Sequence, residues 1–548
     1  MYKIKNKLII LLSILTALVS SCKDLDELNI NPNGVDPKNA DLNLLLPTII
    51  TGIGQNVINL GFGDLAGVMQ HTQYDGWSSG HNDFDWDNQG HNWRGYYDIL
   101  RNDDEYYNKA VEGGYNFHKG VALILKAYTF GYIADLWGDA PYTQALKAED
   151  GTEYFKPVYD PQKDIYHGIL ADLDTANMLL SNNSYKNINK VQDVLYHGDA
   201  GKWRKFANSL ALRYYMRLSV KEPQFAEAGI KKITNNPDIY PVITEADDDA
   251  NVSYIGTSPS DSWPSNTVFD TSPTGNYIRT KMCKTLVDTL QNYNDPRLGV
   301  WANKVTIPLV LAPGTGVDEI INGKRYVSQD IIDEYNAKYD SVGVDFDPEY
   351  VGIPAQIFSA QFYNLTPYLE QAVFNPHVSQ LNDIYKETAG PLLLMRLMSA
   401  AEVNFILSEA ALYGWAPGSP EEHYNNGIRQ SMIAWGVSDQ YDDYITGAPY
   451  SGLESIILQK WIASWTAAAE SWFDYRRTGL PALQTGESAK VPAFPLRFYY
   501  NYDNEIALNP ENAKAAMDKL ERTEYAGSDG NNSAWSRTWL LQGTGLPY

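Results

Sequence analysis

Cysteine is nearly absent from this 548-residue chain, and positive charge is scarce. Only Cys22 and Cys283 occur, too few for the disulfide framework typical of small exported domains. No H-E-x-x-H or C-x-x-C motif is present, which removes two common zinc and redox signatures. Lysine and arginine total 43 against 67 acidic residues, for a formal net charge of −24. Such an acidic chain disfavours nucleic acid as a partner.

The N-terminus has the pattern of an export signal. Lys3, Lys5 and Lys7 precede an apolar run, Leu8–Val19, that is too short to cross a membrane as a helix. Small residues then lead directly to Cys22. We predict a lipoprotein signal peptide over 1–21, with Cys22 acylated and anchored in a membrane. Removal of the three lysines takes the net charge to about −27. An ordinary cleaved signal beside a chance cysteine is the alternative.

Residues 22–40 are predicted to form a tether. An acidic cluster follows the anchor at 23–27, similar to the export signals of lipoproteins displayed on the outer leaflet. A solvated charged linker explains the same residues. We therefore expect an outer-membrane lipoprotein that faces the cell exterior.

The rest of the chain, 41–548, is predicted to be one mostly α-helical domain. Apolar spacing typical of helices recurs over Leu42–Gln70, Trp93–Val111, His118–Leu136, Ile165–Leu180, Trp203–Val220, Phe225–Ile233, Leu397–Leu412, Glu421–Trp435 and Leu453–Tyr475. The pairs Ala401/Phe405 and Ala469/Phe473 have the small-then-aromatic spacing of tetratricopeptide-like helix pairs. Between these helices, 234–390 and 481–548 are predicted to be largely irregular. Because long loops in compact proteins are usually functional, we expect the ligand site on the long loops and not on the helices.

Several short motifs suggest catalytic or metal sites but lack the required context. Gly76–Gly80 matches G-x-S-x-G without the preceding strand. Gly61–Ala66 matches a loose dinucleotide fingerprint inside a helical pattern. Asp83, Asp85 and Asp87 alternate as in a calcium loop, but the EF-hand positions for Gly and Glu hold other residues. We expect no cofactor, with a looser calcium site at these three aspartates as the alternative.

Aromatic residues in the loops are the better candidates for binding. The chain contains 14 Trp and 39 Tyr against 16 Phe, and Tyr and Trp suit wet, partly polar surfaces. Trp93 continues a helical pattern and is predicted to be core. Loops 74–92 and 254–277 are expected to converge on one shallow face and to offer flat rings to a sugar, through Tyr74, Trp77, Trp86, Trp263 and Tyr277.

Taken in order, several segments resemble the SusD/RagB family of nutrient-uptake lipoproteins. They are Asn29–Asn33, Leu44–Pro47, Asp135–Tyr142, Trp203–Ser219, Asp295–Leu298, Ala401–Val403, Ser408–Ala411, Ile457–Lys460, Phe473–Pro481, Pro495–Phe498 and Asn504–Glu505. Their residues are mainly structural in type. Asn208, Arg213 and Arg217, for example, are predicted to be buried polar groups that tie helices together.

The resemblance implies a binding protein that caps a TonB-dependent outer-membrane barrel, and not an enzyme. We therefore expect a lipoprotein that captures glycan and delivers it to that transporter. Capture of oligopeptides by the same fold is an alternative. A surface glycoside hydrolase is a second one, since carboxylate pairs depend on spatial rather than sequence spacing.

Overall fold

The computed structural model describes residues 41–548, apart from 77–78, 89, 183, 342, 369–373 and 528–529. The predicted signal peptide, the tether and Cys22 lie outside the described residues, as does Trp77. Within the described part of the chain helices dominate, so the predicted mostly α-helical fold is confirmed.

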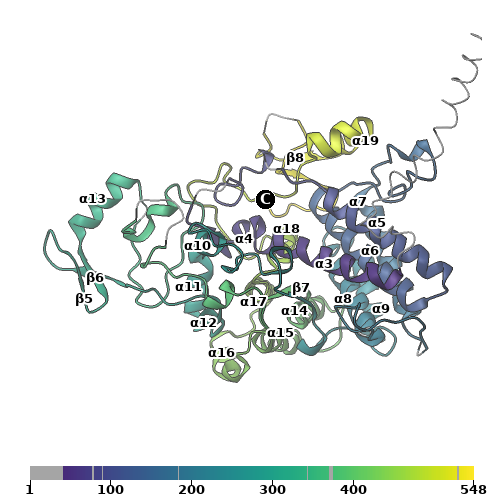
Figure 1. Ribbon diagram of the computed structural model, residues 1–548, viewed down its shortest axis with the longest axis horizontal. Coiled ribbons are helices and arrows are strands. Elements are labelled where there is room, and N and C mark those ends of the chain that lie inside the picture. The colour runs from purple at the N-terminus through teal and green to yellow at the C-terminus, as the bar shows by residue number, and fades with distance from the viewer. Residues whose placement is uncertain are drawn as a thin grey trace, which may run out of the picture.

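A first group of helices packs as successive neighbours on one side of the molecule (Figure 1). Each helix from α5 to α9 contacts the next along the chain. The long helix α3 lies against α5 and β7, and Asp41 caps it by accepting a hydrogen bond from the Asn43 amide. The helices are α3 (Leu42–Gly61), α4 (Asp64–Val68), α5 (Arg94–Glu112), α6 (Asn116–Trp137), α7 (Gln162–Leu179), α8 (Ala200–Arg217) and α9 (Pro223–Thr234).

In the described part of the chain, Leu42–Val68 is the one helical segment long and apolar enough to cross a membrane. Length and composition alone are weak evidence, because core helices pass the same test. Here Leu46, Ile49 and Ile50 of α3 are at most 1% exposed inside the main apolar core. This segment is therefore a core helix.

A second group of helices comes from the C-terminal half. Serine caps start two of them, Ser399 before α14 and Ser419 before α15. A Cβ on Gly427 of α15 would lie 2.7 Å from the Phe405 ring of α14, so a glycine is what lets these helices approach closely. The helices are α14 (Ala400–Leu412), α15 (Pro420–Ala434), α16 (Tyr441–Gly447), α17 (Leu453–Ala463) and α18 (Ala468–Thr478).

Two predicted helices are each broken in two. The segment predicted as 453–475 divides into α17 and α18 because Thr466 adopts a left-handed φ of 70°. The segment predicted as 42–70 divides at Phe62 and Gly63, where a Cβ on Gly63 would lie 2.2 Å from the Asn59 carbonyl oxygen. The end of α3 and the break at Thr466 also touch, since a Cβ on Gly61 would lie 2.7 Å from the Thr466 carbonyl oxygen.

Short antiparallel strand pairs join the long loops to the helices. In one pair Tyr74 lies opposite Thr280, and in another Val252 lies opposite Met395. These pairings bring the predicted loop segments onto the helical body. The strand pairs are β1 (Thr72–Tyr74) with β3 (Thr280–Met282) and β2 (Ala250–Ser253) with β7 (Leu394–Met398). Three short helices occur in the same part of the chain as β3: α10 (Asn276–Arg279), α11 (Lys284–Asn292) and α12 (Arg297–Trp301).

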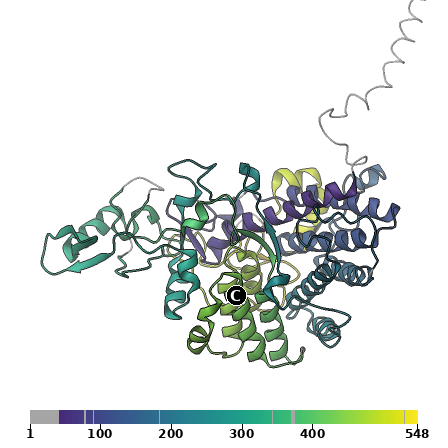
Figure 2. The same ribbon diagram turned by 60° about the horizontal axis from the view of Figure 1, so that its bottom comes forward.

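An arm built from the middle of the chain projects from the body (Figures 1 and 2). It holds a three-stranded sheet in the order β4-β6-β5 and one helix, with a small core of its own around Leu309, Val327 and Ile332. Its elements are β4 (Leu309–Ala312), β5 (Asp318–Ile321), β6 (Lys324–Ser328) and α13 (Gln329–Tyr339).

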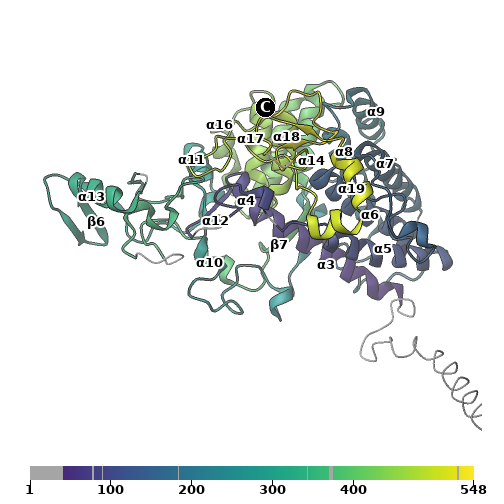
Figure 3. The same cartoon turned by 90° about the horizontal axis from the view of Figure 1, so that it is seen from above.

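The C-terminal tail is mostly irregular, as predicted, and lies across the helices (Figure 3). The Phe498 amide donates to the Leu136 carbonyl of α6, and the Tyr500 hydroxyl donates to the Asp139 carbonyl. Its regular elements are α19 (Pro510–Met517), β8 (Glu521–Arg522) and β9 (Ser536–Arg537).

Candidate functional site

The two predicted binding loops meet at an open hollow of about 160 Å³, here called the Tyr74 hollow. Tyr74 comes from the first loop and Pro264, Ser265 and Asn276 from the second. The β1–β3 pairing explains the meeting, because it sets Tyr74 directly opposite Thr280. Among the described residues, the lining is Ile58, Asn59, Phe62, Gly63, Tyr74, Pro264, Ser265, Asn276 and Thr280.

The described lining of the Tyr74 hollow is uncharged. Ile58, Phe62 and Pro264 supply apolar surface, and the side chains of Asn59 and Asn276 are exposed beside it. Each amide side chain offers two N–H donors and one carbonyl acceptor. The hollow can thus bind a neutral ligand that has both apolar faces and hydroxyl groups.

Tyr74 contributes differently from the flat platform that we predicted. The His81 ring stacks on it with 3.8 Å between centroids, and the Arg279 guanidinium lies over the ring at 5.1 Å. Since His81 occupies one face, the guanidinium must cover the other, and only the ring edge and the hydroxyl remain. Burial, with Asp64 nearby, raises the pKa of Tyr74 to about 12, so its hydroxyl keeps its proton at neutral pH.

The prediction that Trp86 presents an open ring to a ligand is wrong. Its side chain is 1% exposed and packs against Trp472 and Phe498, with centroids 5.4 and 5.1 Å away. The indole N–H donates to the Gly80 carbonyl at 3.0 Å. Trp86 therefore anchors its loop to the helical core. The sequence around it lacks helical periodicity because Trp86 is buried from a loop and not from a helix.

Trp263 and Tyr277 are also buried rather than open. Trp263 is 0% exposed beneath the hollow, packed on Phe62 and Tyr385, and its N–H donates to Ser265 Oγ at 2.9 Å. Tyr277 is 3% exposed and donates to the Leu381 carbonyl at 2.6 Å. Both rings hold the second loop in place, so the prediction of open sugar platforms at these residues is wrong.

The three alternating aspartates each have protein partners. Asp83 accepts from the Gly80 and Asp85 amides, Asp85 pairs with Lys490 at 2.5 Å, and Asp87 accepts from the Ala534 amide. Among the described residues, no cluster of three or more His, Cys, Asp or Glu side chains could hold a metal. The calcium site stays a prediction that the geometry of these carboxylates does not favour.

Sequence reasoning missed the residues at the end of α3. Ile58, Asn59 and Phe62 line the hollow but lie within a segment predicted as one continuous helix. The glycines at 61 and 63 were the available signal, since they mark the break that opens this side of the hollow.

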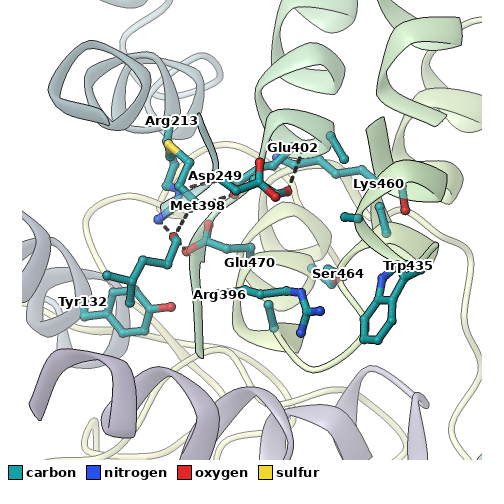
Figure 4. Close-up of a pocket in the computed structure, with 18 residues that line it drawn as sticks. Tyr132, Arg213, Asp249, Arg396, Met398, Glu402, Trp435, Lys460, Ser464 and Glu470 are labelled. Carbon is teal, nitrogen blue, oxygen red and sulfur yellow. Dashed lines mark hydrogen bonds and ion pairs between the residues drawn. The ribbon is translucent and has the colours of Figure 1, made fainter. Parts of the chain in front are cut away.

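A second, enclosed cavity of about 40 Å³ lies between α8, β7, α14, α17 and α18 (Figure 4). Charged side chains line it, in contrast to the Tyr74 hollow. It is called here the ionic cavity and is lined by Arg213, Asp249, Arg396, Glu402, Lys460 and Glu470, among other residues. A buried water needs roughly 10–15 Å³. The ionic cavity thus has room for a few waters but not for a sugar ring.

Ion pairs around the ionic cavity tie helices together. Arg213 binds Glu402 through two hydrogen bonds of 2.7 and 2.6 Å, and its other nitrogen lies 3.4 Å from Glu470. Arg217 donates to Glu470 at 2.6 Å. Burial opposes ionisation of Glu470, but these arginines and Lys460 outweigh it and hold its pKa below the ordinary value. The prediction that Arg213 and Arg217 are buried tying groups is confirmed.

Arg396 has a different environment on the same cavity wall. Its guanidinium lies 4.1 Å from the Trp435 ring centroid and donates to the Leu392 carbonyl at 3.0 Å. Burial lowers the pKa of Arg396 to about 10 and raises that of Asp249 to about 7. Each of these charges is therefore costly to keep.

Residues 38–501 match the model of a protein family described as starch-binding and associating with the outer membrane. The match covers most of the chain. The chain belongs to this SusD-like family. Among curated proteins, none matches this SusD-like chain.

Solved structures support the same fold. A chitin-binding protein is 22% identical, with a TM-score of 0.68 over 92% of this chain and 99% of its own. A Bacteroides vulgatus protein, described as a candidate outer-membrane protein for nutrient binding, is 22% identical with a TM-score of 0.69, covering 92% and 100%. A SusD homologue from Bacteroides fragilis is 22% identical with a TM-score of 0.65, covering 92% and 99%. At these identities the likeness shows the fold.

The family assignment gives the SusD-like protein a coarse role. It is a nutrient-binding protein associated with the outer membrane. SusD-like proteins are binding proteins and not enzymes.

Proposed function

We propose that this SusD-like protein captures oligosaccharides at the Tyr74 hollow and passes them to a TonB-dependent barrel transporter. The observation that carries the proposal is the uncharged described lining, in a chain whose residues are 20% charged. A neutral sugar can lay its C–H face on the half-buried Pro264, while Asn59 and Asn276 bind its hydroxyls.

The same observation argues against the oligopeptide alternative. A peptide with free ends carries an ammonium and a carboxylate group, and burying either one without a partner is costly. The described lining of the Tyr74 hollow offers no carboxylate for the ammonium, and the cation beside it, the Arg279 guanidinium, lies over the Tyr74 ring. The lining therefore favours a neutral ligand over a peptide with a free ammonium group.

The test is a binding panel run on the mature protein. Maltoheptaose and chitohexaose would be titrated by calorimetry beside neutral and charged hexapeptides. We expect at least one glycan to bind with modest affinity, because an open, wet surface must order a flexible chain. Binding of the peptides with no response from any glycan would contradict the proposal.

Anchoring and delivery are parts of the same proposal. Acylation at Cys22 would hold the protein on the outer membrane, facing the exterior, and Cys22→Ser would then release it from membrane fractions. The mature protein should co-purify in mild detergent with a TonB-dependent barrel, through an interface above roughly 1,000 Å². Recovery of monomer alone, with the barrel soluble, would count against the partner.

A further inference from the structure

A second hollow, also of about 160 Å³, opens at the start of α17. It is called here the Tyr293 hollow. Tyr293 follows α11, Tyr424 belongs to α15, and Ser451, Glu454, Ser455 and Gln459 come from the α17 end (Figure 1). It shares no lining residue with the Tyr74 hollow and contains no part of either predicted binding loop.

The aromatic wall of the Tyr293 hollow is fixed from behind. Tyr424 is 1% exposed and its hydroxyl donates to the Ala448 carbonyl at 2.9 Å. Gln459, 1% exposed, donates to the Tyr444 hydroxyl at 2.9 Å, and Tyr444 in turn lies against Arg297. Tyr293 is only half-buried. The buried side chains of Tyr424 and Gln459 thus form a rigid base for the Tyr293 ring, which reaches solvent.

The polar groups of the Tyr293 hollow suit hydroxyls. The Glu454 carboxylate is exposed and has no cation within 4 Å among the described residues. It can accept hydrogen bonds from a ligand. The first N–H groups of a helix have no partner within that helix, so the backbone of Glu454 and Ser455 can donate to ligand oxygens.

We propose that the Tyr293 hollow is a second carbohydrate-contact site, which binds a sugar ring of the same glycan chain or of another one. The inference rests on the proposed glycan-binding function. A helix N-terminus disfavours a cationic ligand, and the free carboxylate disfavours an anionic one. A neutral polyhydroxy ring satisfies the carboxylate, the amide donors and the tyrosine together.

The two hollows differ in how many a given ligand can fill at once. Thr280 lines the Tyr74 hollow, and in the sequence α11 lies between Thr280 and Tyr293. A trisaccharide occupies one hollow at a time, whereas a polysaccharide chain long enough to span both can occupy the two together. Two linked contacts raise the apparent affinity for the polymer without a new contact type.

The experiment compares polymer and trisaccharide binding in four full-length proteins. They are the parent, Glu454→Gln, Tyr293→Ala and a matched control, Glu511→Gln, which removes an acid from the first turn of α19 away from both hollows. Retardation in gels containing amylopectin or soluble glycol chitin measures polymer affinity. Saturation-transfer NMR with maltotriose and chitotriose measures the single contacts.

We expect both hollow variants to bind the retarding polymer about tenfold more weakly, while Glu511→Gln matches the parent. In an Asn276→Ala background, where the Tyr74 hollow is weakened, adding Tyr293→Ala should lower the transfer to trisaccharide further. Glycan binding that is unchanged in both Tyr293-hollow variants would overturn this inference alone. No retardation and no transfer with any of these glycans would overturn the proposed function as well.

Discussion

The ionic cavity and the Tyr74 hollow both place polar side chains beside aromatic rings, but those side chains are mostly paired in the cavity and open in the hollow. In the ionic cavity, Arg213 and Glu402 are joined by two hydrogen bonds, and most of the surrounding charges have partners. In the Tyr74 hollow, the exposed amides of Asn59 and Asn276 have few protein contacts. Buried charge that is paired across helices ties them together, whereas uncharged groups left open are available to a ligand.

The same contrast applies to the aromatic residues. Trp86 and Trp263 are buried with their indole N–H groups bonded to the protein, while Tyr74 keeps only its edge and hydroxyl toward the hollow. Abundant Trp and Tyr in loops therefore indicated how the loops are fastened, and not where a sugar lies.

The largest expected effect is on the ionic cavity. Glu470→Ala should lower the free energy of unfolding by about 3–5 kcal/mol, because it leaves Arg213 and Arg217 buried without this partner. Urea denaturation measures it. Lys514→Ala, which removes an exposed pair with Asp518, is the control and should cost less than about 1 kcal/mol. Equal small losses in both variants would erase the distinction between the two regions. If Glu470→Ala does not fold, Glu470→Gln gives the milder test.

Trp263→Ala should come next, at about 3–5 kcal/mol, because it removes a fully buried indole from a packed aromatic group. Thermal and urea unfolding measure the loss, and Trp263→Phe should recover much of it. A Trp263→Ala protein that unfolds like the parent but no longer binds glycan would restore the open-platform interpretation and contradict the burial argument.

Much of the helical scaffold could be predicted from the sequence, since apolar periodicity reports which face of a helix is buried. The helices α5 to α9, α14 and α15 lie close to their predicted ranges. The breaks at Gly63 and Thr466 could not be predicted in the same way. Thr466 is a residue type that rarely adopts a positive φ, and its conformation depends on contact with the end of α3.

The candidate site was predicted less completely. That loops 74–92 and 254–277 meet was expected, but the burial of Trp86, Trp263 and Tyr277 depends on partners such as Trp472, Phe498 and Tyr385, which are distant in sequence. Local composition cannot distinguish a ring that faces solvent from one that fits against such partners. The uncharged lining likewise becomes visible only when α3 and the second loop are brought together.

A smaller effect is expected from pH, through two buried histidines: His81, which stacks on Tyr74, and His71, which packs against Trp461. Burial lowers the pKa of His71 to about 3 and that of His81 to about 4. The folded state thus binds fewer protons than the unfolded state between about pH 4 and 6.5. Stability from these groups is present above pH 6.5 and lost as the pH falls, by up to about 1.4 kcal/mol per pH unit for each histidine.

Acids whose pKa is raised by burial act in the opposite direction, Asp249 and Glu505 among them. Burial raises the pKa of both Asp249 and Glu505 to about 7, so the stability they contribute is lost as the pH rises. Because these opposing contributions are the same in every variant, the effect of His81 is measured by comparing the pH dependence of a His81 variant with that of the parent. Urea titrations at pH 5 and 7 should show a smaller acid-induced loss in His81→Gln than in the parent, with His423→Gln as the surface control. Identical pH dependence in all three proteins would rule out buried neutral His81.

The smallest effect on stability should come from the rim of the Tyr74 hollow. Asn276 is exposed, and its side chain makes one long hydrogen bond, 3.4 Å to the Pro264 carbonyl. Asn276→Ala should therefore change the free energy of unfolding by less than about 0.5 kcal/mol. Its loss of a ligand hydrogen bond should weaken glycan binding by about 1 kcal/mol, roughly fivefold. Calorimetric titration and urea unfolding on the same preparations measure both, with Asn236→Ala, just after α9, as a control remote from the hollow. A variant that unfolds earlier yet binds like the parent would place Asn276 with the structural residues and leave the Tyr74 hollow without its main polar contact.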